Sequence, residues 1–214
     1  MNHIYVTVIV PATVLIPIGT GLIKTVYKNQ PSKTMLLYLL FAGVTDVIER
    51  IMGLHNINNL PLLHFYTIAE YLFILRFFQL SINKSGVSWI IWALFILFPL
   101  LSVLDFLFIQ NIYEYNSYPR PISALIIIGL CMYYFLNYSN QENKTPWVTI
   151  PVNWIVTGLL IYFSSSFAYF AFLNLITQKA SDNLYFIFGG IHATLVLLMY
   201  LMVAAGFLQV KNEG

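Results

Sequence analysis

The sequence predicts an all-α integral membrane protein, a bundle of seven transmembrane helices with its N-terminus outside and its C-terminus in the cytoplasm. Of the 214 residues, 59% are hydrophobic and 8% are charged, whereas about a quarter of an ordinary soluble domain is charged. The apolar residues also gather into runs of about 20, the length that a helix needs to cross a membrane. This composition excludes a cytosolic enzyme, a secreted disulfide scaffold and a nucleic-acid-binding module.

Seven such runs follow one another, and we expect them to form one transmembrane domain over residues 1–214 without a soluble domain. The runs lack the alternation of polar and apolar residues that a transmembrane β-barrel requires, so we expect helices. Pro11 and Pro17 should kink the first of them. The predicted helices span residues 4–27, 34–54, 62–81, 87–109, 119–138, 149–177 and 183–208.

The positions of lysine and arginine predict the orientation of the bundle, because cytoplasmic loops retain basic residues. Arg50, Arg120 and Lys179 fall on one side of the predicted bundle. Because this side carries fewer basic residues than the other, it is predicted to face outside. The pattern predicts a multi-pass protein of the cell membrane. The remaining seven of the ten basic residues fall on the cytoplasmic side: Lys24, Lys28, Lys33, Arg76, Lys84, Lys144 and Lys211.

Charged residues inside the bilayer are costly, at about 2.5–3.5 kcal/mol each on insertion scales, and in this chain they are clustered. At a rise of about 1.5 Å per residue, Asp46, Glu70 and His192 all lie about 12 Å below the outer surface. Residues three or four positions apart share a helix face, and several polar residues have this spacing. They are Asp46, Glu49, Arg50 and Gly53; Tyr66 and Glu70; Tyr162, Ser165, Ser166 and Tyr169; and Tyr185, Gly189 and His192.

These faces predict a polar pocket in the outer half of the bundle, closed below by aromatic and aliphatic side chains. We expect His64, Asp105 and Arg120 to lie at its rim. The alternative is structural, with the same polar groups serving only to hold the helices together. The residues predicted to bind a ligand or a proton are Asp46, Glu49, Arg50, Tyr66, Glu70, Ser165, Tyr185 and His192.

Three functions are compatible with such a pocket. The first is a receptor-like or sensor-like protein that binds a small molecule, a lipid, an ion or a proton and acts through a membrane or cytoplasmic signalling partner. His192 would be its protonation switch, since histidine changes charge near neutral pH. The second is an intramembrane hydrolase or other lipid-modifying enzyme, with Glu70, His192 and Asp46 as acid–base candidates and Ser165 or Ser166 as a nucleophile. The third is a proton-coupled transporter.

No cofactor is predicted. Glu70, His192 and Asp46 are acceptable zinc ligands by type, but no pair of histidines has metal-binding spacing. The layout resembles that of the rhodopsins, whose retinal requires a lysine in the last helix; residues 183–208 contain none, so retinal is excluded. The layout also resembles that of the intramembrane ceramidase and progestin-receptor-like hydrolases, which carry two zinc-binding histidines on the last helix, where this chain has His192 alone.

One short segment carries a resemblance of its own. Asn58-Asn59-Leu60-Pro61 is followed by His64-Phe65-Tyr66-Thr67-Ile68-Ala69-Glu70. This segment resembles a group of uncharacterised bacterial multi-helix membrane proteins. The resemblance implies a bacterial inner membrane and an importance for Tyr66 and Glu70, but it implies no activity. The sequence leaves the ligand, the partner and the oligomeric state open.

Overall fold

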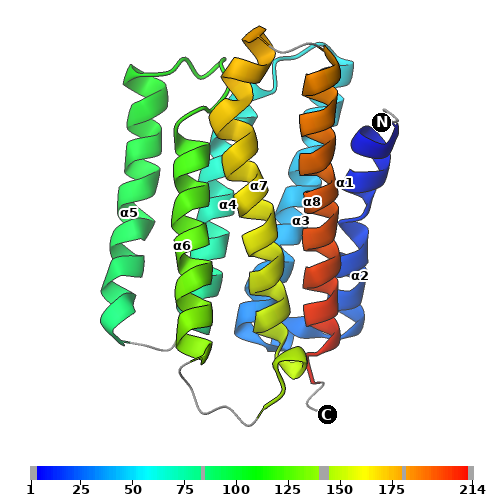
Figure 1. Ribbon diagram of the computed structural model, residues 1–214, viewed down its shortest axis with the longest axis vertical. Coiled ribbons are helices and arrows are strands. Elements are labelled where there is room, and N and C mark those ends of the chain that lie inside the picture. The colour runs from blue at the N-terminus through cyan, green and yellow to red at the C-terminus, as the bar shows by residue number, and fades with distance from the viewer. Residues whose placement is uncertain (1–3, 83–84, 140–144, 180–181, 212–214) are drawn as a thin grey trace.

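The protein is a bundle of helices in two layers (Figure 1). The computed structural model describes residues 4–82, 85–139, 145–179 and 182–211, and the side chains at 85, 139, 172–179 and 182–186 lie outside this description. Every regular element in the described residues is helical. The back layer holds α3 (Gln30–Leu54) and α4 (Leu60–Ser81). The front layer holds α5 (Ser85–Phe108), α6 (Pro119–Ser139), α7 (Pro151–Lys179) and α8 (Asp182–Leu208).

The N-terminal segment packs beside α8 and is broken into three pieces, where the sequence predicted one kinked helix over 4–27. These pieces are η1 (Tyr5–Ile9), α1 (Val10–Ala12) and α2 (Leu15–Ile23). Proline explains the irregularity, because it has no N–H to donate and its ring clashes with the carbonyl four residues earlier. Two short 3₁₀ helices, η2 (Val26–Lys28) and η3 (Trp147–Thr149), lead into α3 and α7.

Proline also marks where the long helices begin. Pro31 and Pro61 lie in the first turns of α3 and α4, and α6 and α7 start at Pro119 and Pro151. A proline in the first turn removes an N–H that would have no partner within the helix. Asn29 caps α3 as well, because its side chain accepts a hydrogen bond from the backbone N–H of Ser32 at 3.1 Å.

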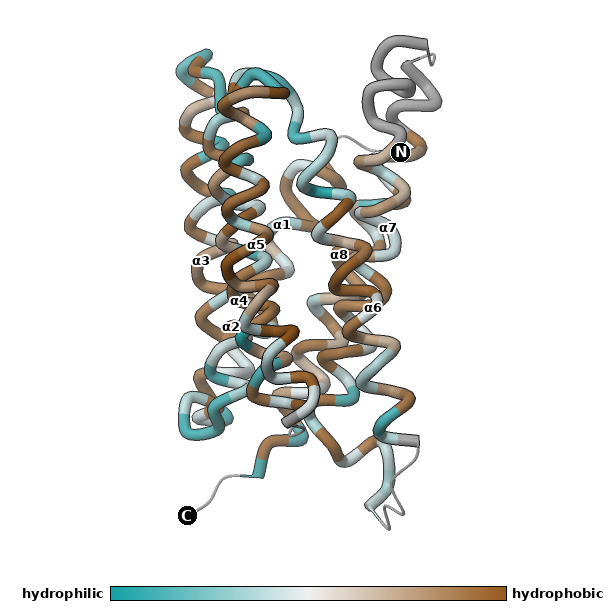
Figure 2. Tube along the Cα trace, turned by 90° about the vertical axis from the view of Figure 1, so that its left-hand side faces the viewer, coloured by the Kyte–Doolittle hydropathy of each residue, from teal (hydrophilic) through white to brown (hydrophobic). Residues whose placement is uncertain are grey.

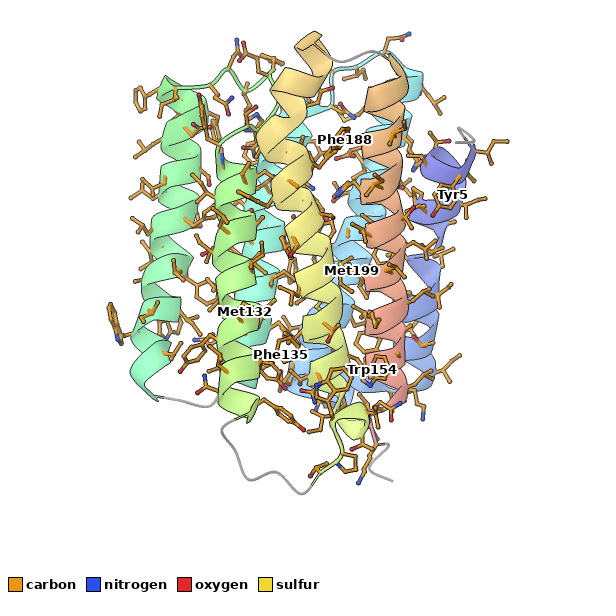
Figure 3. The ribbon with its side chains drawn as sticks, viewed as in Figure 1. Tyr5, Met132, Phe135, Trp154, Phe188 and Met199 are labelled. Atoms are coloured by element: carbon orange, nitrogen blue, oxygen red, sulfur yellow. The ribbon has the colours of Figure 1, made fainter. Side chains whose placement is uncertain are left out.

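Among the described residues, six stretches are long and apolar enough to cross a membrane, which indicates a multi-pass membrane protein. Figure 2 shows hydrophobic residues dominating the helices between the two ends of the bundle. Large apolar side chains also lie on its outside, such as Met132, which is 51% exposed (Figure 3). The predicted span over 34–54, which corresponds to α3, is not among the six. This helix carries Lys33, Asp46, Glu49 and Arg50. The six stretches are Tyr5–Ile23, Leu60–Ser81, Gly86–Phe108, Pro119–Tyr138, Pro151–Ala171 and Ile187–Leu208.

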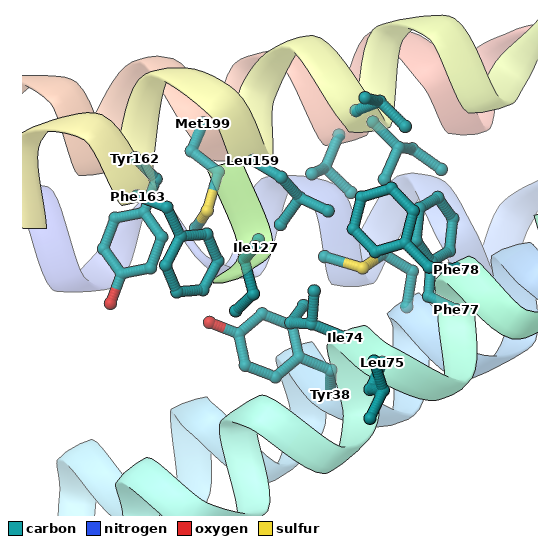
Figure 4. Packing of buried hydrophobic residues seen from close by; sticks show 14 of the residues in the cluster. Tyr38, Ile74, Leu75, Phe77, Phe78, Ile127, Leu159, Tyr162, Phe163 and Met199 are labelled. Carbon is teal, nitrogen blue, oxygen red and sulfur yellow. The ribbon is translucent and has the colours of Figure 1, made fainter. Parts of the chain in front are cut away.

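The core fills the half of the bundle nearer the C-terminus, which we call the lower half and which lies at the bottom of Figure 1. Figure 4 shows Tyr162 and Phe163 at one end of the buried cluster, Phe77 and Phe78 at the other, and Tyr38 between them. All the long helices except α5 contribute residues that are 0% exposed to this packing, among them Met35, Leu39, Ile74, Phe77, Phe78, Ile127, Leu159, Val203 and Phe207.

Candidate functional site

A buried carboxylate lies between the two layers, above the apolar core. Glu70 on α4 is 2% exposed, and its Oε1 accepts hydrogen bonds from three tyrosine hydroxyls. The donor–acceptor distances are 2.7 Å from Tyr38, 3.2 Å from Tyr66 and 3.1 Å from Tyr162. These tyrosines come from α3, α4 and α7, and we call them the tyrosine cage. Hydrogen bonds to a carboxylate are among the stronger ones in proteins, so the cage joins three helices at one point.

The sequence spacing explains one part of the cage. Tyr66 and Glu70 are four residues apart and therefore share a face of α4. The ring of Tyr66 stacks on Phe41 of α3, with centroids 5.8 Å apart and planes 5° from parallel. This packing holds the hydroxyl of Tyr66 toward Glu70.

A buried guanidinium lies next to the cage. Arg120, in the first turn of α6, is 7% exposed. Its Cζ is 4.2 Å from the ring centroid of Phe170 and 5.7 Å from that of Tyr66, which are favourable positions for a cation over an aromatic ring. Its Nη2 donates to the hydroxyl of Tyr162 at 3.3 Å. Because Tyr162 donates in turn to Glu70, its hydroxyl connects the cation to the carboxylate.

One hydrogen-bonding group of Arg120 has no partner in the described part of the chain. Its Nη1 is buried and has no hydrogen-bond partner among the described residues. Buried polar groups in folded proteins nearly always have a partner, so an exception needs an explanation. The sequence placed Arg120 at the rim of the pocket, whereas the structure places it inside, packed between α4 and α7.

His192 on α8 lies beside the cage. Its ring stacks on that of Tyr169, with centroids 4.9 Å apart, and its Nδ1 is 3.0 Å from Oγ of Ser165 on α7. Ser165 donates its single hydroxyl proton to the backbone carbonyl of Tyr162 at 2.8 Å. With the serine proton used in this way, the contact to His192 is made with the imidazole proton on Nδ1. A general base would have to accept the proton of the serine instead.

The three charged residues in the upper part of α3, which are Asp46, Glu49 and Arg50, do not all face the cage. Asp46 and Arg50 form an ion pair, with Nε–Oδ2 at 2.7 Å, and their side chains are 40% and 41% exposed. They line a groove between the N-terminal segment and α3. Glu49 is half-buried and within electrostatic range of Arg120. Successive residues of a helix are about 100° apart, so Glu49 and Arg50 project on opposite sides of Asp46.

His64 and Asp105 lie together, between α4, α5 and the loop that follows α5. His64 is 1% exposed and its Nε2 lies 3.0 Å from the backbone carbonyl of Glu114. Asp105 is 6% exposed and lines a cavity of about 390 Å³ between α5 and α6. The side chain of Tyr185, another predicted ligand-binding residue, lies outside the described residues.

Within the part of the chain that the structure describes, no three His, Cys, Asp or Glu side chains gather in a way that could hold a metal ion. The three candidate zinc ligands have separate surroundings. Asp46 pairs with Arg50, Glu70 accepts from the cage, and His192 contacts Ser165.

No protein-family model, curated protein or solved structure matches this chain. Its function is therefore inferred from the geometry of Glu70 and Arg120.

Tyr38 is the cage residue that lay on none of the predicted polar faces, whereas Tyr162 lay on one but was not among the predicted ligand-binding residues. Tyr38 lies eleven residues, or about three turns, before Glu49 and so shares a face with it. Thr45, which is 4% exposed, lies on the same face. The repeat of Tyr38, Thr45 and Glu49 is a signal in the sequence for a polar face of α3 that points inward.

Proposed function

We propose that this chain is a seven-helix membrane protein of receptor or sensor type, which binds a small polar ligand from outside and acts through a partner. One observation carries the proposal: the buried Arg120 has an open Nη1 donor and is linked to the caged Glu70 through the hydroxyl of Tyr162. A buried charge without a complete set of partners is unfavourable. A hydrogen-bond acceptor on a ligand, such as a carboxylate, phosphate or carbonyl oxygen, would complete it.

The arrangement of basic residues supports an outward-facing site. Lys28 lies between α2 and α3, Arg76 in the last turns of α4 and Lys211 after α8, all at the lower end of the bundle. Basic residues are retained in the cytoplasm, so the end that carries Arg120 is the outer one. α3 runs along the bundle beside α4, which supports counting it as the seventh crossing. The resemblance of residues 58–70 favours a bacterial inner membrane.

The packing below the cage supports binding over transport. Three apolar residues follow Glu70 along α4, and each is 0% exposed: Ile74, Phe77 and Phe78. Leu159 of α7 packs in the same cluster, also at 0%. A carrier needs polar groups on both sides of its site, whereas these residues form a closed apolar layer on the lower side.

The contact between Ser165 and His192 bears on the hydrolase alternative. A serine nucleophile passes its proton to the neighbouring base, but Ser165 donates to the carbonyl of Tyr162. In this arrangement the pair is a hydrogen-bonded contact between α7 and α8. Elemental analysis of the purified protein tests the metal-dependent form of this alternative, since one zinc per chain would favour a hydrolase.

A ligand screen tests the leading proposal. Purified protein in detergent would be melted in the presence of acetate, succinate, glutamate and inorganic phosphate. We expect at least one of them to raise the melting temperature of the wild type and to leave that of Arg120→Gln unchanged. Arg76→Gln, which removes an exposed arginine at the opposite end, is the matched control and should keep the shift. No shift with any of these compounds would contradict a ligand that binds through Arg120.

The protonation switch has its own test. If His192 is the switch, the melting temperature of the wild type should change between pH 5 and pH 8 in a way that His192→Ala does not reproduce. Identical pH profiles for the two proteins would remove His192 from this role.

A further inference from the structure

A groove of about 620 Å³ separates the N-terminal segment from the upper part of α3. Val8, Pro11 and Leu15 line one wall, and Leu40, Val44 and Val47 line the other. The walls open to the outside of the bundle, as Leu15 and Val44 are 66% and 60% exposed. Along α3 the groove extends from Leu40 to Arg50, a length of about 15 Å at the rise of an α-helix.

The ion pair of Asp46 and Arg50 lies at the upper end of this apolar groove. Arg50 also donates through Nη1 to the backbone carbonyl of Thr7. Thr7 lies four residues before Pro11, which has no N–H to offer that carbonyl. The break in the N-terminal segment thus provides an acceptor that anchors Arg50 across the groove.

Both charged groups of the pair are partly exposed, and Arg50 has unused hydrogen-bond donors. A guanidinium has five N–H donors, and Arg50 uses Nε and Nη2 for Asp46 and Nη1 for Thr7. Two N–H groups are left for a further acceptor. About two-fifths of each side chain is exposed, so the pair presents a positive and a negative group side by side at the mouth of an apolar channel.

We propose that this groove binds one membrane phospholipid whose headgroup carries both a phosphate and a primary ammonium. The phosphate would accept from the free N–H groups of Arg50, and the ammonium would donate to Asp46. Arg50 lies four residues, or about 6 Å, from the end of α3, which would place it where a lipid phosphate meets the acyl region. The acyl chain would lie along Val44 and Leu15. A free phosphate could contact Arg50 but would leave the apolar channel empty.

Lipid-dependent thermal stability tests the proposal. Delipidated protein in detergent would be melted with added phosphatidylethanolamine, phosphatidylcholine or phosphatidylglycerol of the same acyl composition. We expect phosphatidylethanolamine to raise the melting temperature of the wild type most, because the choline ammonium has no N–H and the glycerol headgroup has no ammonium. Arg50→Gln should lose this preference, and Arg76→Gln should keep it.

A second variant keeps the test independent of the ion pair. Val44→Trp leaves Asp46 and Arg50 in place but fills the groove, so it should also lose the preference for phosphatidylethanolamine. Equal shifts with the three lipids, or an unchanged preference in both Arg50→Gln and Val44→Trp, would overturn the proposal. Arg120→Gln should retain the lipid preference while losing the response to small carboxylates or phosphate, which separates this site from the ligand site at the cage.

Discussion

Tyr162 connects the buried cation of the site to its buried carboxylate. Its hydroxyl donates to Glu70 and accepts from Arg120, so one oxygen links α4, α6 and α7. The ring packs against Phe163 at a centroid distance of 4.7 Å, which fixes the direction of the hydroxyl. At the scale of single residues, the site is therefore a carboxylate and a guanidinium held apart by one phenol.

Tyr162→Phe removes this link while keeping the ring. We expect the free energy of unfolding to fall by about 1.5–3 kcal/mol, the usual contribution of a hydrogen bond to a charged group. Reversible unfolding in mixed micelles measures the change. Tyr113→Phe makes the same chemical change at a tyrosine that is 61% exposed and should have little effect. Equal losses in the two variants would contradict the role of the Tyr162 hydroxyl.

Replacing Asp105 should raise the free energy of unfolding, which is the opposite of the change expected for Tyr162→Phe. Its Oδ2 is buried without a hydrogen-bond partner among the described residues, as is Oγ of Ser102 in the same cavity. It also lies near the C-terminal end of α5, where a negative charge is unfavourable. We expect Asp105→Leu to raise the free energy of unfolding by about 1–3 kcal/mol, and Asp105→Asn to raise it less. A loss of stability in Asp105→Leu would indicate that the carboxylate has a bound partner.

At the scale of elements, α7 and α8 form the most extensive helix pair, and glycine permits their approach. A Cβ atom at Gly206 would lie 2.8 Å from the backbone carbonyl of Pro151 and 3.0 Å from Ile155. At Gly158 it would lie 3.1 Å from the carbonyl of Met199. Small residues at such positions allow transmembrane helix backbones to come close together.

Gly206→Ala should therefore separate the two helices at their lower ends and reduce stability by about 1–3 kcal/mol, as overpacking does elsewhere. Gly129→Ala is the matched control, because nothing lies within 4 Å of a Cβ built at that position on α6. Alanine in a helix interior is favoured over glycine by about 0.5–1 kcal/mol, so the control should be slightly stabilised. Thermal melting of both variants checks the opposite signs.

At the scale of the whole molecule, the orientation in the membrane is open to a direct test. Cys131 is the one cysteine in the chain and is 0% exposed, so the wild type should not react with a membrane-impermeant thiol reagent. With the N-terminus outside, Glu114→Cys should be labelled in intact cells. Lys28→Cys should be labelled only after the membrane is opened. The reverse pattern would invert the bundle and contradict an outward-facing site.

Much of the fold could be predicted because membrane helices are encoded locally. Helix α4 was expected over 62–81 and spans Leu60–Ser81; α8 was expected over 183–208 and spans Asp182–Leu208. The break in the N-terminal segment was anticipated only as a kink at Pro11 and Pro17. The site was harder to predict. Glu70 and Tyr66 share a local spacing, but nothing local joins Tyr38 or Arg120 to them.

By itself, the sequence determined that this is a helical membrane protein, where its helices lie and that its buried charges are clustered. Each of these properties depends on residues within about one helix length of one another. Only the tertiary structure decided which charges meet. Tyr38 and Tyr162 are 32 and 92 positions from Glu70, and their contacts depend on which helices are neighbours and how each is rotated. That rotation turned Glu49 toward Arg120 and turned Asp46 and Arg50 into the groove, because a helix divides adjacent residues between different faces.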